Sequence, residues 1–270
     1  MTPEDREFLA ELCAERAGLR VDPEKAYLIE SRLAPVARRE GFAAVAELVK
    51  ALREAPDERL AMVCVEAMAP SETGFFRDRA VLEHLWRKVV PDLARRRPDG
   101  VVRIWSAGCA TGQEIYSFAM LQAEAPAPGK VELFASDLSE RLLDRARLGL
   151  YTSFEVQRGL SARRLTRHFE NRDDNLQLAK PLRQQVRWRQ VNLLDDLAAL
   201  GAFDIVLCRY VLGGLTPAAR VRVAERLAGA VAADGVLVLG AGEETSASSF
   251  MPDSEVRGVF HHTRDIRVAA

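Results

Sequence analysis

A turn of small residues and two nearby acids form the part of this sequence best suited to chemistry. The stretch SAGCATG places Gly108 and Gly112 around small side chains, and Glu114 follows directly behind it. Asp137 comes after the next apolar run, VELFAS. A turn without bulky side chains lets the backbone approach a ligand closely. A carboxylate in the position of Asp137 can accept both hydroxyls of a ribose, so the two features together indicate a nucleoside-like ligand.

The ligand that these residues favour carries both a ribose and positive charge. The turn lacks the G-x-G-x-x-G pattern of dinucleotide sites, and it lacks the lysine and hydroxyl residue of a phosphate-binding P-loop. S-adenosylmethionine meets both demands, because its sulfonium and amino groups are cationic while Glu114 and Asp137 are acidic. An acid after a strand is also a favoured helix cap, so a structural role for Asp137 stays open here.

The elements that must position these residues follow the pattern of a doubly wound α/β sheet. Residues 101–105 are β-branched and apolar, which predicts a buried strand, and residues 113–121 have helical spacing. Further strands are expected in VELFAS, FDIVLCR and GVLVLGAGE, with helices in SERLLDRARLGLY and in the segment capped by Thr216. This alternation is typical of a parallel sheet whose ligand site lies at the carboxyl ends of the strands.

The chain consists of two regions with different sequence patterns. Residues 1–90 read as helices and a linker, with Thr2 as the cap of a first helix that ends near Gly18. We expect a small helical domain there and a ligand-binding α/β domain over 91–270. A polar, arginine-rich stretch at about 152–188 interrupts the strand pattern, which predicts an inserted small subdomain.

Composition excludes several classes of protein. The chain has 270 residues, 48% of them hydrophobic, and a net charge of −1, which argues against nucleic-acid binding. No apolar run is long enough to insert in a membrane, and the acidic N-terminus is unlike a signal peptide. We therefore expect a cytoplasmic protein with reduced thiols and no metal site. The four cysteines, which show no CxxC pairing, are Cys13, Cys64, Cys109 and Cys208.

Read together, several segments resemble the CheR-type chemotaxis receptor methyltransferases. They are SETGFFRD, RIWSAGCATGQEIYS, ASDLSERLLDRARLGLY, VNLLD with FDIVLCRYVL, and LVLGAGEE, in the order that the family has them. The resemblance covers nearly the whole chain. It implies an S-adenosylmethionine-dependent methyltransferase sheet with a helical N-terminal domain and an inserted subdomain. It also implies methyl transfer to glutamate side chains of chemoreceptors, which gives methyl esters and S-adenosylhomocysteine.

The resemblance also implies a set of site residues. We expect Gly108 of the turn to approach the cofactor, and Arg77 to act in catalysis by holding the acceptor carboxylate through a charge-assisted pair. The alternative for Arg77 is a structural pair with Asp78 or another acid. The positions that correspond to the family's cofactor contacts are Ser71, Thr73, Arg77, Glu114, Asp137, Asn192, Leu193, Tyr210 and Val211.

Three departures from the family pattern leave a second hypothesis open. The family usually has asparagine at the positions of Ser71 and Tyr210, and a tyrosine where this chain runs through Gly213 and Gly214. That tyrosine lies close to the expected acceptor. The alternatives are therefore an active receptor methyltransferase, a non-catalytic S-adenosylmethionine-binding sensor, or a methyltransferase for another protein or small acid. We expect Tyr210→Asn to raise the transfer rate, and Asp137→Ala to weaken cofactor binding with folding nearly intact.

The expected partners are the cytoplasmic helices of chemoreceptors. The family members that bind a C-terminal receptor tether carry a glycine-containing loop in the insertion, whereas ENRDDNLQ here is shorter and lacks glycine. We therefore expect a tether-independent enzyme, acting as a monomer. The basic residues of the helical region form either a solvated helix face or a docking surface for receptor glutamates. These residues are Arg32, Arg38, Arg39, Lys50 and Arg53.

Overall fold

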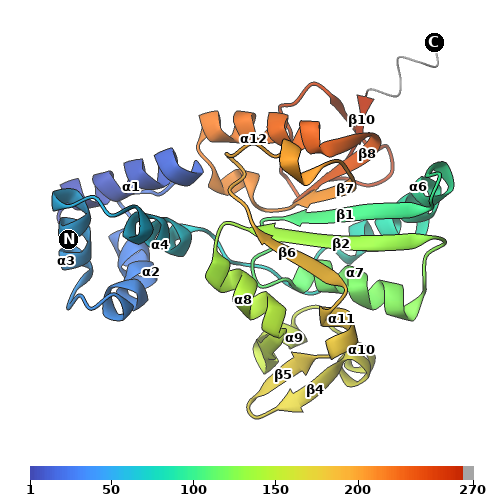
Figure 1. Cartoon of the computed structure of the whole chain (residues 1–270), viewed down its shortest axis with the longest axis horizontal. Coiled ribbons are helices and arrows are strands. Elements are labelled where there is room, and N and C mark those ends of the chain that lie inside the picture. The colour runs from blue at the N-terminus through green and yellow to red at the C-terminus, as the bar shows by residue number, and fades with distance from the viewer. Residues whose placement is uncertain (264–270) are drawn as a thin grey trace. The chain divides into compact units, whose positions relative to one another are not determined.

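The computed structural model describes residues 1–263, which form two compact units (Figure 1). The helical unit consists of Met1–Pro70 together with Leu212–Val223, and the sheet unit consists of Ser71–Val211 together with the chain from Ala224 onward. Each unit therefore draws on segments that are distant in the sequence.

Four helices with inward-facing apolar side chains build the helical unit. Thr2 caps the first helix: its hydroxyl accepts the backbone N–H of Asp5, whose carboxylate accepts the backbone N–H of Thr2. Gly18 ends that helix in the left-handed conformation that glycine adopts without strain. The helices are α1 (Pro3–Ala17), α2 (Ala26–Arg39), α3 (Val45–Glu54) and α4 (Glu58–Met68).

The later segment Leu212–Val223 joins the helical unit through backbone hydrogen bonds. The N–H of Arg20 donates to the carbonyl of Gly214 at 2.9 Å, and the N–H of Thr216 donates to the carbonyl of Gly18 at 2.8 Å. This segment holds the short helix η3 (Leu212–Gly214) and the first half of α12 (Pro217–Ala230). The glycine pair in which the chain departs from the family thus belongs to the helical unit.

Residues between the two predicted domains belong to the sheet unit. They form α5 (Arg79–His84), the π-helix η1 (Leu85–Val89) and α6 (Val90–Arg96). The division between the two compact units falls between Pro70 and Ser71, within the stretch that the sequence assigned to the helical domain and its linker. The physical reason is burial, because these helices add large apolar side chains to the core of the sheet unit. Those side chains are Leu82, Leu85, Trp86, Val90 and Leu93.

The predicted α/β sheet is confirmed, with seven strands in the order β6-β2-β1-β7-β8-β10-β9. The first five of these run parallel, while β10 is antiparallel to both of its neighbours. The chain order reverses direction between β1 and β7, and such a switch point opens a crevice at the carboxyl ends of the strands. The strands are β1 (Val101–Ala107), β2 (Lys130–Asp137), β6 (Val186–Gln190), β7 (Phe203–Cys208), β8 (Val231–Leu239), β9 (Phe250–Pro252) and β10 (Val259–His262).

Helices α7 (Gln113–Glu124) and α8 (Glu140–Leu148) follow β1 and β2 as the sequence predicted. Ile115 and Phe118 of α7 are fully buried in one apolar cluster with Ile104 of β1. Thr216 caps α12, since its hydroxyl accepts the N–H of Ala219. The remaining short helix is η2 (Ala198–Leu200).

The inserted subdomain carries its own three-stranded sheet, in the order β3-β5-β4. Figure 1 shows it beyond α7 and α8, away from the main sheet. The chain then returns through β6 to the edge of the main sheet. The elements of the insertion are β3 (Leu150–Thr152), α9 (Ser153–Gln157), α10 (Ala162–His168), β4 (Phe169–Arg172), β5 (Asn175–Leu178) and α11 (Lys180–Arg183).

Among the described residues, no helix combines the length and the apolar character that a membrane span requires. All four cysteines are buried and none forms a disulfide. Burial raises the pKa of the Cys13 thiol and of the Cys64 thiol to about 12 each. These thiols are therefore protonated and chemically inert at neutral pH.

Candidate active site

The glycine turn after β1 is packed so tightly that two of its positions require glycine. Gly108 has φ +77°, and a Cβ there would lie 2.6 Å from Cγ2 of Val211. Gly112 has φ +85°, and a Cβ there would lie 2.7 Å from the ring of Trp188. The N–H groups of Gly108 and Cys109 both donate to the carbonyl of Ser136 at the end of β2, each at 2.9 Å. The turn is thus a compact backbone surface at the carboxyl edge of the sheet.

Asp137 ties this turn to the start of α8. Its side chain is 6% exposed; Oδ2 accepts the N–H of Ala110 at 2.8 Å and Oδ1 accepts the N–H of Ser139 at 3.0 Å. Burial raises the pKa of the Asp137 carboxyl, while hydrogen bonds from backbone N–H groups oppose the rise. The structural role that the sequence left open is therefore present. A carboxylate has about four acceptor sites, so capacity for an outside hydroxyl remains beside the backbone N–H groups of Ala110, Ser139 and Leu138.

Arg209, directly after β7, is the central cation of the site. Its side chain is 2% exposed and donates to Oε2 of Glu114 at 2.5 Å and to Oδ2 of Asp78. Burial alone would lower the pKa of the Arg209 guanidinium, but the charges of Glu114 and Asp78 raise it. Ser106 donates its hydroxyl to the other oxygen of Glu114 at 3.1 Å. The charge of Glu114 is thus already compensated within the protein.

The sequence did not point to Arg209, and it indicated Asp78 only as a possible partner of Arg77. The available signal was the position of Arg209 immediately after a buried strand next to β1, where side chains of a doubly wound sheet face the ligand crevice. Asp78 gave no such signal. The role of Asp78 in the site depends on its ion pair with Arg209, which lies 131 residues further along the chain.

The ring of Tyr210 lies against the guanidinium of Arg77. The Arg77 guanidinium carbon lies 3.5 Å from the centroid of the Tyr210 ring, and the Tyr210 hydroxyl donates to Oδ2 of Asp78 at 2.5 Å. The backbone N–H of Tyr210 donates to Oε2 of Glu243 at 2.6 Å. Asp78 pairs with Arg209, and no carboxylate among residues 1–263 lies within ion-pair distance of Arg77. The structural ion pair considered for Arg77 is therefore absent from the described part of the chain.

The backbone on both sides of Arg77 is strained. Phe76 has φ +49° and Asp78 has φ +53°, in a left-handed region that bulky residues seldom adopt. Such conformations cost about 1–3 kcal/mol each and persist only where the surroundings hold them. The N–H of Phe76 donates to the buried hydroxyl of Ser117 at 3.0 Å, and Asp78 is held by Arg209 and Tyr210. The direction in which Arg77 points is thus determined from both sides.

A small cleft lies between the glycine turn, Arg77 and the residues that follow β7. The cleft brings together five of the predicted site residues: Thr73, Arg77, Gly108, Glu114 and Tyr210. Its further lining residues are Glu72, Gly74, Cys109 and Arg209.

The other predicted site residues, Asp137 among them, lie outside that lining. Val211 packs behind Gly108, and Ser71 is exposed. Oδ1 of Asn192 accepts the N–H of Leu194 at 3.0 Å, which forms a turn after β6. Leu193 lies in the same turn and is partly buried.

The residues present fit a ribose-bearing cofactor. Gly108 lines the cleft without a side chain of its own, with Val211 filling the place of a Cβ, and Asp137 has acceptor capacity next to the same turn. Among residues 1–263, no group of three His, Cys, Asp or Glu side chains is placed to hold a metal ion.

Two models of known protein families match this chain. The model of the CheR methyltransferase SAM binding domain matches residues 71–255, and that of the CheR methyltransferase all-alpha domain matches residues 4–63. The first match begins at the residue where the sheet unit begins.

Proteins of known function are similar over nearly the whole chain. The chain is 36% identical to the chemotaxis protein methyltransferase Cher2 of Pseudomonas putida over 255 residues, covering 92% of this chain and 90% of that protein. It is 35% identical to chemotaxis protein methyltransferase 1 of Pseudomonas aeruginosa, with the same coverage. It is 32% identical to the chemotaxis protein methyltransferase of Vibrio parahaemolyticus, covering 90% of each chain.

Proposed function

This chain belongs to the CheR methyltransferase family, as an S-adenosylmethionine-dependent methyltransferase of chemotaxis, and we propose that its acceptors are glutamate side chains of chemoreceptors. The product is a glutamate methyl ester, formed in adaptation. The observation that supports this acceptor is Arg77, a guanidinium without a carboxylate partner among the described residues, lining the cleft beside the glycine turn.

The acceptor makes few chemical demands on the protein. A glutamate carboxylate is ionised at pH 7 and needs no general base. S-adenosylmethionine, when bound, supplies a methyl group that its sulfonium already activates. The remaining work of the protein is alignment and partial removal of water from the nucleophile. Arg77 serves alignment by donating charge-assisted hydrogen bonds to the acceptor carboxylate, while the ring of Tyr210 holds its guanidinium in place.

The same proposal assigns the cofactor-binding roles. Asp137 accepts the ribose hydroxyls, and Gly108 allows the backbone to approach the cofactor. Glu114 reaches the cofactor's amino end from its pair with Arg209. The other contacts proposed from the family pattern are Ser71, Thr73, Arg77, Asn192, Leu193, Tyr210 and Val211.

The proposed partners are the cytoplasmic helices of chemoreceptors, which the protein would meet as a cytoplasmic monomer. Tether-independent recognition is supported by the turn between β4 and β5. The ladder continues to the pair Arg172 and Asn175, so only Asp173 and Asp174 form the turn. A turn this short lacks the glycine-containing loop that the tether-binding members carry.

A methyl-transfer assay tests the proposal. The protein is incubated with receptor fragments and S-adenosylmethionine that carries a labelled methyl group. We expect label on receptor glutamates. Mild alkali should release this label as methanol, as it does from methyl esters. Arg77→Met is expected to lose most transfer even when the cofactor is saturating. Binding without any transfer, on receptors from the same cell, would reject the proposal and support the sensor, to which the departures at Ser71, Tyr210, Gly213 and Gly214 also point.

A further inference from the structure

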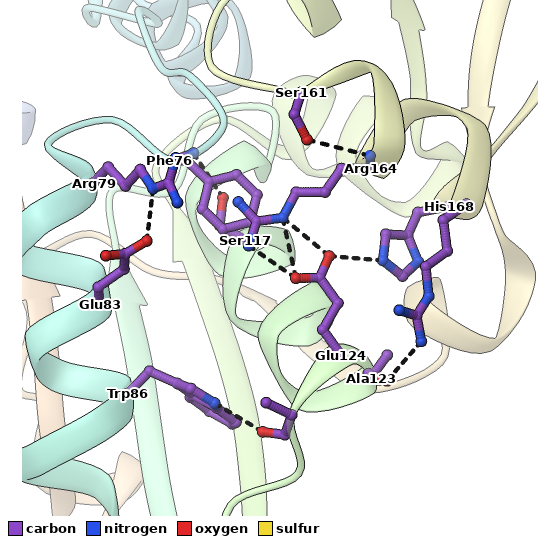
Figure 2. A network of polar contacts seen from close by, with 12 residues as sticks. Phe76, Arg79, Glu83, Trp86, Ser117, Ala123, Glu124, Ser161, Arg164 and His168 are labelled. Atoms are coloured by element: carbon purple, nitrogen blue, oxygen red, sulfur yellow. Dashed lines mark hydrogen bonds and ion pairs between the residues drawn. The ribbon is translucent and has the colours of Figure 1, made fainter.

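The inserted subdomain reaches the strained loop that carries Arg77. Arg164 of α10 places its guanidinium carbon 3.8 Å from the centroid of the Phe76 ring. Figure 2 shows Arg164 extending from α10 to Phe76 and Glu124, with His168 on the far side of Glu124. Phe76 is the residue immediately before Arg77, so a contact on its ring bears directly on the backbone from which Arg77 projects.

Arg164 is itself held firmly. Its guanidinium makes three hydrogen bonds to the carboxylate of Glu124, at 3.0, 3.1 and 2.8 Å, and Nε2 of His168 lies 3.0 Å from the same carboxylate. The Arg164 and Glu124 side chains are 15% and 20% exposed. Burial alone would raise the pKa of Glu124, but hydrogen bonds from Arg164 and His168 lower it, so the pair is ionised. A two-pronged pair of this kind fixes orientation as well as distance.

A second contact from the insertion reinforces the first. Gly159, in the turn before α10, has φ +103°, and a Cβ there would lie 1.8 Å from the carbonyl oxygen of Phe75. No other residue allows that turn to lie against the loop. The insertion therefore touches two consecutive residues of the loop, one through backbone and one through a side chain.

We infer that Arg164 of the inserted subdomain is a positioning residue for Arg77. The left-handed Phe76 needs its surroundings to hold it, and Arg164 acts on its ring while Ser117 acts on its N–H. The insertion thus completes the active site from outside the main sheet. This inference rests on the proposed function insofar as Arg77 binds the acceptor, but the ordering of the loop can be measured without any turnover.

Hydrogen exchange measures that ordering directly. In Arg164→Met, we expect amides of residues 71–78 to exchange at least ~10-fold faster than in wild type, as for a segment whose local opening is eased. Arg163→Met is the matched control, because Arg163 is an exposed neighbour on the same helix. Arg164→Lys keeps a charge for Glu124 but loses the planar face, so an intermediate increase is expected. Unchanged exchange in a folded Arg164→Met protein would overturn the inference.

A double-mutant cycle shows whether Arg164 acts through Arg77. Arg164→Met is expected to lower kcat/KM for a receptor fragment by ~10-fold, as misplacement of an aligning group does. Once Arg77 is already methionine, adding Arg164→Met should cost no further activity. Full additivity would mean that Arg164 acts independently of Arg77 and would reject the inference. A wild type that transfers no methyl would reject the proposed function instead, and hydrogen exchange alone would then decide the role of Arg164.

Discussion

Arg77 lies over the ring of Tyr210, 3.5 Å from its centroid, while the Tyr210 hydroxyl is bonded to Asp78, the residue after Arg77. One tyrosine thus supports both the guanidinium and the backbone of its loop. In this chain Tyr210 stands where the family usually has asparagine, and its contacts make it part of the apparatus that orients Arg77.

This contact reverses the effect that the sequence led us to expect for Tyr210→Asn. Asparagine has no ring to hold Arg77, so we now expect KM for a receptor fragment to rise by about 2- to 30-fold, the equivalent of a cation–π contact of about 0.5–2 kcal/mol. Tyr210→Phe keeps the ring and should lose less. Steady-state kinetics at saturating cofactor measure both variants, and titration with S-adenosylhomocysteine measures any change at the cofactor separately. A faster Tyr210→Asn enzyme would show that the ring obstructs the acceptor.

Asp137→Ala should weaken both cofactor binding and folding. The loss of two ribose hydrogen bonds costs on the order of 2–4 kcal/mol of binding. The substitution also leaves the N–H groups of Ala110 and Ser139 without their acceptor, at about 1–3 kcal/mol each. Folding therefore should not stay nearly intact, contrary to the expectation from sequence. Calorimetric titration and urea unfolding separate the two effects, and an unchanged dissociation constant would leave Asp137 a purely structural residue.

The raised pKa of Asp137 predicts a pH dependence of binding. Protonation removes charge and acceptor capacity, so affinity for S-adenosylhomocysteine should fall as pH drops from neutral through the raised pKa, above the ordinary 3.8. Stability has the opposite sign: the folded state favours the protonated form, so the contribution of Asp137 to stability is present at low pH and lost as pH rises through that pKa. Titrations from neutral pH downward, over the range in which the protein stays folded, test this. Asp137→Asn should flatten the profile, and an equal slope in that variant would assign it to another group.

Arg209→Met should destabilise the sheet unit strongly. It leaves Glu114 and Asp78 without the buried cation between them, and breaking a buried pair on one side costs about 3–5 kcal/mol. Lys130→Met is the control, since its exposed pair with Glu132 contributes only about 0–1 kcal/mol. Urea unfolding followed by tryptophan fluorescence reports on this unit, which contains all three tryptophans. Similar losses in both variants would contradict the assigned role.

Charge reversal on α2 should weaken receptor docking. Arg38 is exposed and has no carboxylate partner among the described residues, whereas Arg53 pairs with Asp5 and Lys50 with Glu54. Changing Arg38 and Arg39 to glutamate should reduce receptor affinity most at low salt and leave cofactor binding alone. Arg95→Glu serves as the control, because Arg95 is an exposed, paired arginine of α6 outside the proposed docking surface. Receptor affinities that match wild type across a salt series would exclude this surface.

The sequence by itself was sufficient for features that depend on local patterns. The alternation of apolar runs and amphipathic stretches predicted β1, α7, β2, β7 and α12 and thereby the fold class. Thr2 and Thr216 are the helix caps that their residue types indicated. Gly108 and Gly112 both have positive φ, as expected for glycines in a compact turn. The strands, helices and caps depend on residues within a few positions of one another, whereas the contacts that exclude a side chain at Gly108 and Gly112 come from the distant Val211 and Trp188.

The tertiary structure alone decided how the site is held together. Arg209 meets Glu114 across 95 residues and Asp78 across 131, and Tyr210 meets Asp78 across 132. Arg164 reaches the Phe76 ring from the insertion. Such pairs form because β1 and β7 are neighbours at the centre of the sheet, and because the insertion contacts Phe75 and Phe76. No local periodicity encodes which distant side chains a sheet will bring together, since that follows from strand order and from packing of the whole core.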